Sequence, residues 1–392
     1  MSASEFAANA GPLVISNVDV FVYRAPIGTP VQTSFGLMRD RAAVLVRLMD
    51  KDGVEGWGEV WCNFPTVGAE HRARLLIDSV APLVLGQAWP DPAACFEFLT
   101  RRLHVLAVQS GEPGPVAQVI AGVDIALWDL FSKRSGQPLW RLLGGQSESV
   151  AVYASGLNPT EPQRLAERRA AEGYRAFKLK VGFGESRDIG NLRALRKTLG
   201  EDAILMTDAN QAWNIEEACR MSERLAEYRP IWLEEPIGAD LPVESWIELA
   251  HRSSIPLAAG ENFRGDSQFD EFIHSGALRI VQPDAAKWGG FTRCVALGRR
   301  ANENQTWFCP HWLGGGIGLA ASLQLKAAVG GPGYVEVDAN PNPLREQLLE
   351  SSFEVMDGAI RLSERSGLGI EPDLEGSKRF LACALSSDSK DT

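Results

Sequence analysis

Between residues 178 and 311, five short apolar runs each end in side chains that can bind a metal ion or move a proton. The first run carries two lysines at alternate positions, and the next three end in acids. The fifth run ends in a histidine. These side chains are Lys178, Lys180, Asp208, Glu234, Glu235, Glu261 and His311.

The spacing of the acids predicts a parallel barrel. Asp208, Glu234 and Glu261 are 26 and 27 residues apart, and one strand–helix unit of such a barrel takes roughly 25 to 35 residues. The carboxyl ends of barrel strands surround one active site, so the three acids are expected to converge. Carboxylates without a thiolate or imidazole set favour a hard cation, foremost Mg²⁺. The alternative is that each acid caps the following helix, which explains one acid more readily than three in register.

The composition sets the class of protein. The chain has 392 residues, of which 45% are hydrophobic and 23% charged, as is usual for a globular protein with more than one domain. The formal charge of −11 argues against a nucleic-acid partner or an anionic membrane. It does not argue against a small anionic substrate, because a divalent cation and lysines reverse the field inside a cleft.

The cysteines and the first residues indicate location. The six cysteines show no zinc-type spacing, which is typical of thiols in a reducing compartment. Residues 1–10 lack the basic and apolar regions of a signal peptide, and we expect no apolar run of membrane-spanning length. We therefore predict a cytoplasmic protein with no membrane partner.

The order of the expected elements in residues 1–140 predicts an α+β module, because strands come first and helices follow without alternation. A loop rich in Gly, Pro, Thr and Ser is expected over 26–35. The expected strands are 13–15 with 18–23, 41–49 and 56–60, and the expected helices are 71–85, 93–106 and 116–135.

From residue 150, strands alternate with helices, which predicts an α/β barrel over residues 141–345. The eight expected strands are 150–153, 176–181, 204–208, 231–235, 256–261, 279–284, 307–311 and 334–338. The tail, residues 346–392, is too short for a domain of its own, and we expect it to complete the N-terminal module.

These motifs together resemble the enolase superfamily, specifically the mandelate racemase group of the mandelate racemase / muconate lactonizing enzyme family. The resemblance covers nearly the whole chain and rests on Lys178-Leu179-Lys180, Asp208-Ala209-Asn210, Glu234-Glu235-Pro236, Gly260-Glu261-Asn262, Gln282-Pro283-Asp284 with Gly289-Gly290, and Pro310-His311. It implies a modified (β/α)₇β barrel under a capping domain. It also implies Mg²⁺ on Asp208, Glu234 and Glu261, with Glu235 as a neighbour that is not a ligand.

The position five residues before Gly289 separates the groups of this family. Relatives resembling muconate-lactonizing enzymes and dipeptide epimerases carry a lysine there as second base. This chain has Asp284, and His311 follows one unit later, which resembles the His–Asp dyad of the racemase group. Lys287 matches a lysine common to both groups and is given no catalytic role.

These residues suit the removal of a proton next to a carboxylate. The reaction leaves an enediolate, whose two negative oxygens a divalent cation stabilises. Lys180 is the expected base on one face, with Lys178 lowering its pKa by repulsion and touching the substrate carboxylate. The alternative, a solvated strand edge, fits poorly because apolar residues flank both lysines. His311, oriented by Asp284, is expected to act from the opposite face.

Other side chains are expected to bind the substrate. Glu336 resembles an acid of the group that hydrogen-bonds a substrate carboxylate oxygen. Specificity is expected from loops of the capping domain, where Arg39 and Arg41 are either partners for a polar distal group or plain surface charges. The expected substrate-contacting residues are Asn210, Arg39, Arg41, Phe35 and Trp312.

Three reactions share the enediolate. Loss of a β-hydroxyl dehydrates an acid sugar to a 2-keto-3-deoxy acid, and residues 310–325 and 336–345 most resemble acid-sugar enzymes. Loss of a lactone or ring oxygen gives a cycloisomerase, and return of the proton gives a racemase or epimerase of a 2-hydroxy acid. Dehydration is our leading prediction. A metal-binding scaffold without activity and a two-metal hydrolase are remoter alternatives. The resemblance also implies a homo-oligomer, often an octamer.

Overall fold

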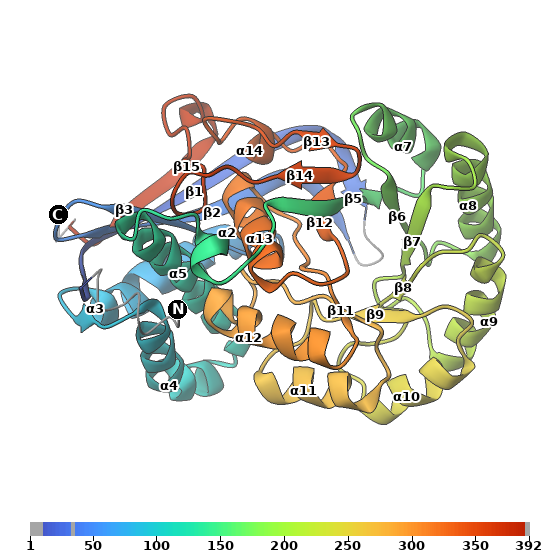
Figure 1. The fold of residues 1–392 in the computed structure, drawn as a ribbon, viewed down its shortest axis with the longest axis horizontal. Coiled ribbons are helices and arrows are strands. Elements are labelled where there is room, and N and C mark those ends of the chain that lie inside the picture. The colour runs from blue at the N-terminus through green and yellow to red at the C-terminus, as the bar shows by residue number, and fades with distance from the viewer. Residues whose placement is uncertain (1–10, 33–35, 389–392) are drawn as a thin grey trace.

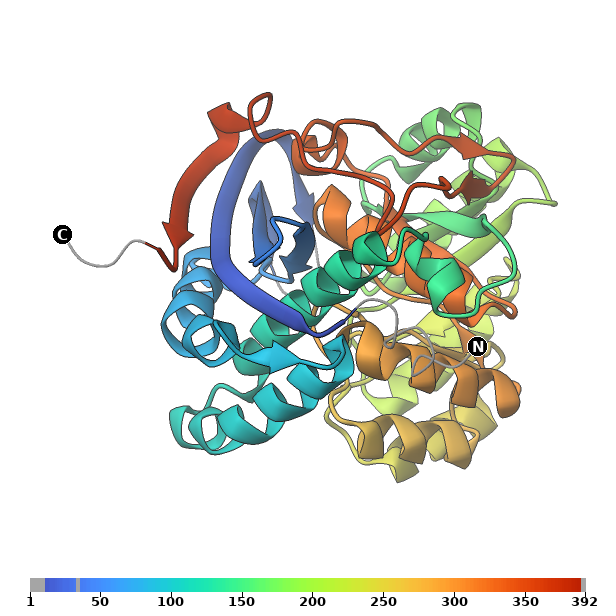
Figure 2. The same ribbon diagram turned by 60° about the vertical axis from the view of Figure 1, so that its left-hand side comes forward.

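The computed structural model of the chain describes residues 11–32 and 36–388. Its N-terminal part is an antiparallel sheet in the order β15-β1-β2-β3, and the long β1 runs beside β15 from the other end of the chain (Figure 2). The strands of this sheet are β1 (Leu13–Gln32), β2 (Leu37–Asp50), β3 (Glu55–Val60) and β15 (Leu381–Ser386), and β4 (Ala88–Trp89) pairs with the start of β1.

The loop expected over residues 26–35 is a wrong prediction for residues 26–32. These residues continue β1, and Pro26, Val31 and Gln32 pair with β2 on the two sides of an irregularity. The composition was misleading because β15 pairs with β1 only from Asp19 to Tyr23. An edge segment with a bulge accommodates proline. Residues 33–35, including Phe35, lie outside the described residues.

Helices cover one face of this sheet (Figure 1). They are α2 (Gly68–Leu75), a π-helical turn (Leu76–Val80), α3 (Ala81–Val84), α4 (Pro92–Ser110) and α5 (Pro113–Arg134). Asp91 caps α4 by accepting a hydrogen bond from the amide of Ala94 at 2.8 Å. By length and hydropathy α5 meets the test for a membrane span, which the sequence analysis did not expect, but 89% of its apolar window is buried. Burial of this kind is typical of a core helix.

The second part of the chain is the barrel (Figure 1). Parallel strands pair in chain order from β5 to β11, and β12 returns to pair with β5. Its strands are β5 (Ser149–Leu157), β6 (Ala176–Lys180), β7 (Ile204–Asp208), β8 (Leu233–Glu234), β9 (Leu257–Ala259), β10 (Ile280–Val281), β11 (Trp307–Phe308) and β12 (Val335–Asp338). The barrel predicted from the strand–helix alternation is confirmed.

Helices follow the barrel strands and enclose them. After the short α6 (Leu139–Leu142), these helices are α7 (Pro162–Ala171), α8 (Glu185–Leu199), α9 (Ile215–Ala226), α10 (Val243–Arg252), α11 (Asp266–Ser275), α12 (Gly290–Glu303) and α13 (Gly316–Val329). The apolar face of α9 is buried, and the amide of Glu217 bonds the side chain of its N-cap Asn214 at 2.9 Å.

The interior of the barrel has an apolar layer below a polar one. The apolar layer comprises Tyr153, Ala176, Met206, Trp232, Ala258, Ile280 and Cys309. Because side chains two residues apart on a strand point the same way, Lys178, Glu234 and Gln282 stand one layer nearer the carboxyl ends. All three are fully buried, so the polar layer is enclosed.

The tail serves both parts of the molecule. It contains α14 (Pro343–Glu346), β13 (Val355–Met356), β14 (Ala359–Arg361), a 3₁₀ turn (Lys378–Phe380) and β15. β15 pairs with β1 as expected for a tail that completes the N-terminal module. β14 instead pairs antiparallel with β5 of the barrel, which the prediction for residues 346–392 did not foresee. The domain boundary between residues 140 and 141 stays a prediction.

A buried acid joins the two parts and predicts a pH effect on stability. Asp124 of α5 accepts hydrogen bonds from the amide and hydroxyl of Thr292 in α12, at 3.1 and 2.5 Å. Burial raises the pKa of Asp124 to about 7, although the bonds from Thr292 lower it. Between its ordinary value of 3.8 and about 7, the folded state keeps a proton that the unfolded chain has lost. Its contribution to stability is therefore complete below pH 3.8 and is lost as the pH rises through 7.

We expect Asp124→Asn to flatten this dependence. The free energy of unfolding of the unaltered protein should fall between pH 4 and 7 by more than that of the variant, with a difference on the order of 3 kcal/mol. Urea unfolding at a series of pH values, followed by tryptophan fluorescence, measures both curves. Parallel curves would contradict the raised pKa.

Candidate active site

Lys178 is held at the centre of the polar layer. Its ammonium lies 2.7 Å from both carboxylate oxygens of Glu234 and 3.0 Å from Glu336. Burial lowers the pKa of Lys178, but the charges of Glu234 and Glu336 outweigh burial and hold it well above its ordinary value. Lys178 on β6 is therefore held as a cation and directed at the carboxylates of Glu234 on β8 and Glu336 on β12.

Lys180 stands two residues further along β6. Its ammonium donates to Asp208 at 2.5 Å and to the side-chain oxygen of Asn210 at 2.8 Å. Burial lowers its pKa, the Asp208 carboxylate raises it, and Lys178 lowers it, with a net pKa above the ordinary value. Lys178 thus lowers the pKa of Lys180 as predicted, but the attraction of Asp208 is larger and the net pKa is raised.

Asp208 and Glu234 end adjacent strands and are direct neighbours in the register of β7 and β8. Both are about 1% exposed. Burial and the charge of Asp208 raise the pKa of Glu234 to about 7, against the effect of Lys178. The amide of Gln282 also donates to Glu234, at 2.7 Å. Two carboxylates packed this closely favour a cation between them.

His311 forms the predicted dyad with Asp284. The ring atom Nδ1 lies 2.7 Å from Oδ2 of Asp284, whose other oxygen accepts the amides of Ala286 and Lys287 at 2.9 and 3.1 Å. On the other side of the ring, Nε2 lies 2.6 Å from Glu261. Burial lowers the pKa of His311, but Glu261 and the other acids raise it well above its ordinary value. The acids around the ring therefore favour its protonated form, which can donate a proton.

Glu336 lies between Lys178 and His311. It accepts a hydrogen bond from the hydroxyl of Ser155 and from the amide of Trp312 at 3.2 Å, and it lies 3.3 Å from Nε2 of His311. Burial raises its pKa, but Lys178 and His311 outweigh burial and lower it to about 2. The carboxylate form of Glu336 is thus stabilised by the cations on both sides.

The donor set suits a hard divalent cation. Asp208, Glu234 and Glu261 lie at or just beyond the ends of three successive strands and supply only carboxylate oxygens. In the part of the chain that the structure describes, no three acidic, His or Cys side chains are already arranged as a metal site. The three carboxylates instead pair with Lys178, Lys180 and His311. These three side chains supply the positive charge next to the carboxylates that a bound metal ion would also supply.

Arg41 reaches the barrel mouth and Arg39 does not. Arg41 comes from β2 of the capping sheet and forms an ion pair with Asp338 at the end of β12, where both side chains are about 2% exposed. The Nε atom of Arg41 is buried and has no hydrogen-bond partner. Arg39 is exposed. Trp312 is buried, and its indole donates to the carbonyl of Gly315 at 2.8 Å.

We expect Arg41→Met to lower the free energy of unfolding by about 3–5 kcal/mol, because it leaves the Asp338 carboxylate buried without its cation. Arg39→Met, two residues away and exposed, is the matched control and should change stability by about 0.5 kcal/mol or less. Urea unfolding measures both. Equal stability of the two variants would contradict a tightly buried pair, and adding Asp338→Asn to Arg41→Met should recover part of the loss.

Several residues of the site were not given a role from the sequence. Ser155 and Gln282 bond Glu336 and Glu234, respectively. Glu235 is fully buried and accepts the amide of Asn262 at 2.9 Å. The motif containing Gln282 was a visible signal, since it occupies the same inward-facing position on β10 as Lys178 on β6. No local pattern marks Ser155.

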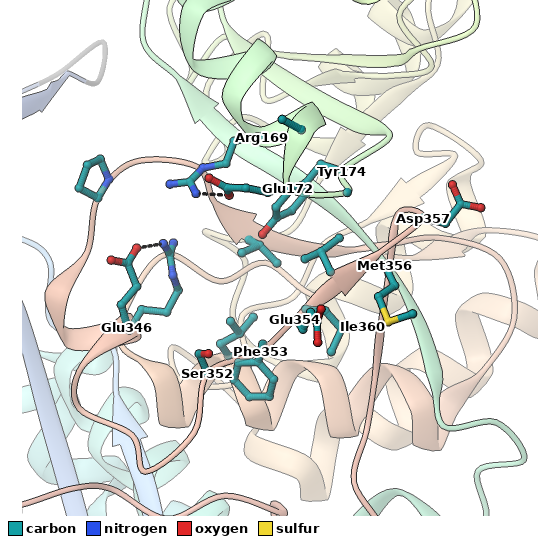
Figure 3. Close-up of a pocket in the computed structure, with 17 residues that line it drawn as sticks. Arg169, Glu172, Tyr174, Glu346, Ser352, Phe353, Glu354, Met356, Asp357 and Ile360 are labelled. Carbon is teal, nitrogen blue, oxygen red and sulfur yellow. Dashed lines mark hydrogen bonds and ion pairs between the residues drawn. The ribbon is translucent and has the colours of Figure 1, made fainter.

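A separate cavity of about 950 Å³ lies near α7, α14 and the β13–β14 hairpin (Figure 3). Tyr174, Phe353 and Met356 contribute to its wall. Its two cations, Arg169 and Arg345, are paired with Glu172 and Glu346. None of the candidate catalytic residues lines it. We therefore place the active site at the strand ends, where the titratable groups converge.

Fold and site together define a barrel enzyme with acids, lysines and a His–Asp dyad at the carboxyl ends of its strands. Residues 16–144 match the family "Mandelate racemase / muconate lactonizing enzyme, N-terminal domain", and residues 161–376 match "Enolase C-terminal domain-like". The chain belongs to the mandelate racemase / muconate lactonizing enzyme family of the enolase superfamily.

Three similar proteins illustrate the range of this family. A crystal structure of a mandelate racemase/muconate lactonizing enzyme from Bordetella bronchiseptica has 47% identity and a TM-score of 0.88, over 94% of this chain and 99% of that one. The D-galactarolactone cycloisomerase of Agrobacterium fabrum is 31% identical over 90% of this chain and 95% of its own. The L-talarate/galactarate dehydratase of Salmonella typhimurium, liganded with Mg and L-lyxarohydroxamate, has 27% identity and a TM-score of 0.84, covering 97% and 95%.

Similar proteins are named as dehydratases, cycloisomerases and racemases. The chain is accordingly an enzyme of this group, a dehydratase or an isomerase. Some structural neighbours contain bound magnesium, which agrees with the carboxylate donor set found here.

Proposed function

We propose that this enzyme dehydrates an acid sugar to a 2-keto-3-deoxy acid by removing the proton next to the carboxylate. The observation that carries the proposal is the placement of Lys180 and the His311–Asp284 dyad on opposite sides of one buried carboxylate cluster. Such a pair can take a proton from one face of a substrate and deliver one at the other.

In the proposed reaction, Lys180 as the free amine takes the α-proton, and the electron pair of the C–H bond moves into the carboxylate to give an enediolate. The His311 imidazolium then gives its proton to the β-hydroxyl, which leaves as water while the C–O bond breaks. The enol that remains takes up a proton at carbon 3 and becomes the 2-keto-3-deoxy acid. Lys178 binds the substrate carboxylate, and Glu336 hydrogen-bonds one of its oxygens through a proton that the two carboxyl groups share.

The proposed cofactor is Mg²⁺, held by Asp208, Glu234 and Glu261. It would supply positive charge for the enediolate oxygens, which no uncharged donor matches in strength. The same cation would take over the carboxylate that now attracts Lys180, and the pKa of this lysine would then fall toward the range that a base needs. Asn210, bonded to Lys180, is placed to contact the substrate.

A lactone cycloisomerase is the second candidate, and its support is the likeness to the D-galactarolactone enzyme over most of both chains. The two reactions differ only in the group that leaves, a hydroxyl or a lactone oxygen. The ion pair of Arg41 with Asp338 at the barrel mouth supports a substrate with a polar distal end in either case.

The experiment is a screen of sugar mono- and diacids and their lactones with Mg²⁺ in deuterated water, followed by proton NMR and a keto-acid assay. A 2-keto-3-deoxy product supports the dehydratase. A ring-opened isomer supports the cycloisomerase, and deuterium at the α-carbon without other change supports a racemase. Absence of exchange in every compound would contradict all three.

The cellular location, the oligomeric state and the domain bounds of the enzyme are also proposals. The family resemblance supports a cytoplasmic homo-oligomer with a capping domain over residues 1–140 and 346–392 and a barrel over residues 141–345. Sedimentation velocity would show the oligomeric state, and a single boundary at the mass of one chain would contradict the oligomer.

A further inference from the structure

Glu59, near the end of β3 in the capping sheet, reaches into the barrel. The side chain is 1% exposed, and its Oε1 and Oε2 accept the amides of Gly315 and Gly318 at 2.6 and 2.8 Å. These amides belong to the first turn of α13, where the N-cap residue is a glycine that has no side chain for the purpose. Glu59 therefore caps a barrel helix from the other part of the molecule, with its two oxygens on the free amides at the start of the helix.

The loop capped in this way begins at His311. Gly315 is held on both sides, because its carbonyl accepts the indole N–H of Trp312 at 2.8 Å while its amide donates to Glu59. A side chain at Gly315 would place its Cβ 2.6 Å from the Glu59 carboxylate, so the fit is close. Asn63 also donates to the carbonyl of Leu313. The backbone that follows His311 is thus tied to residues 59–63.

The same segment contacts the loop that carries Asp284. The amide of Trp61 donates to the carbonyl of Ala286 at 3.3 Å, and the ammonium of Lys287 lies 4.5 Å from the centre of the Trp61 ring. Ala286 in turn donates its amide to Asp284. One stretch of the capping sheet therefore touches the loops that supply both members of the His311–Asp284 dyad.

We propose that Glu59 is a positioning residue for His311, which fixes the loop after the histidine so that its ring stays on Asp284 and faces the substrate. Lys180 stands on β6 and is held by Asp208 and Asn210, which Glu59 does not bond. Loss of the Glu59 carboxylate should therefore impair one of the two bases and spare the other. The part of this inference that concerns proton transfer rests on the proposed function.

The first test is hydrogen–deuterium exchange of the full-length protein with Mg²⁺, read by mass spectrometry over residues 312–320. In Glu59→Gln one acceptor is replaced by a donor that faces an amide N–H, so exchange in this segment should rise about 10-fold. The matched control is Asp129→Asn, because Asp129 is a fully buried acid of α5 that accepts the amides of Trp57 and Leu368. It should leave residues 312–320 unchanged. Equal exchange in Glu59→Gln and the unaltered protein would overturn the proposal.

The second test compares the two faces of the substrate. With the two α-epimers of an active sugar acid in deuterated water, Glu59→Gln should lower kcat for exchange by His311 about 10-fold and change KM little. Exchange by Lys180 should change less than about twofold. Glu59→Asp keeps both acceptor oxygens and should recover part of the loss, and it replaces Glu59→Gln if that variant does not fold.

Equal losses on the two faces would overturn the positioning role. If the unaltered enzyme exchanges the α-proton of no compound, the proposed function fails. The exchange of residues 312–320 then still decides whether Glu59 holds the loop.

Discussion

Lys180→Met is expected to lower kcat/KM about 10³-fold, the usual effect of removing a general base. The ammonium of Lys180 stands at the carboxyl end of β6, bonded to Asp208 and Asn210, and is the side chain placed to approach a substrate from the β6 side. Methionine has a similar length and no proton-accepting group. The measurement is the rate of α-proton exchange and of product formation with the compound found in the screen.

A second substitution separates a base from a mere positive charge. Lys180→Arg keeps the charge next to Asp208, but arginine is not deprotonated in proteins and cannot take the proton. Both variants should therefore lose activity to a similar degree. An arginine variant that keeps more than about a tenth of the activity would show that Lys180 acts only through its charge. Thermal unfolding of both variants shows whether they are folded.

The placement of the site could be predicted because the barrel converts chain spacing into proximity. Asp208 and Glu234 are 26 residues apart, and the structure pairs them directly in the register of neighbouring strands. The dyad of His311 and Asp284 was predicted from the resemblance to the racemase group, and the two side chains meet just after β11 and β10. The proximity of the acids required only that the strands be recognised and parallel.

The contacts between the two parts of the molecule could not be predicted in this way. Glu59 lies 256 residues from Gly315, and Arg41 lies 297 residues from Asp338, so no local pattern relates the partners. The sequence analysis left open whether Arg41 was a surface charge, and the structure places it in a buried ion pair. The net pKa of Lys180 could not be predicted either, because the lowering by Lys178 was foreseen but the larger attraction of Asp208 was not.

The adjacent acids Glu234 and Glu235 allow the sharpest test of the metal site. Both are buried and both have a raised pKa, but their side chains have different partners. Glu234 bonds Lys178 and Gln282 inside the barrel. Glu235 has a positive φ of 37° and bonds Asn262. The spacing of the acids favoured Glu234 as the metal ligand. Its partners favour it again, because the Glu234 carboxylate already binds the cation of Lys178 inside the barrel.

Glu234→Gln is therefore expected to weaken Mg²⁺ binding about 100-fold and to abolish detectable turnover, because it removes a charged oxygen donor. Glu235→Gln should weaken binding about threefold or less, since burial and the charges of Glu261 and Asp208 hold the pKa of Glu235 well above its ordinary value. A neutral amide resembles the protonated acid that this position already favours. Calorimetric titration with Mg²⁺ and the Mg²⁺-dependent rise of the thermal midpoint measure binding without a substrate.

Asp208→Asn should behave like Glu234→Gln if these carboxylates share one ion. If Mg²⁺ no longer raises the thermal midpoint of Glu235→Gln but still raises that of Glu234→Gln, the metal ligand is Glu235. That result would contradict the argument from strand register. A rise that survives all three substitutions would place the metal elsewhere. The distinction matters for the chemistry, because a cation bound by Glu234 faces Lys178 and the substrate carboxylate, whereas one bound by Glu235 would lie beside Asn262 and leave the enediolate without its main counter-charge.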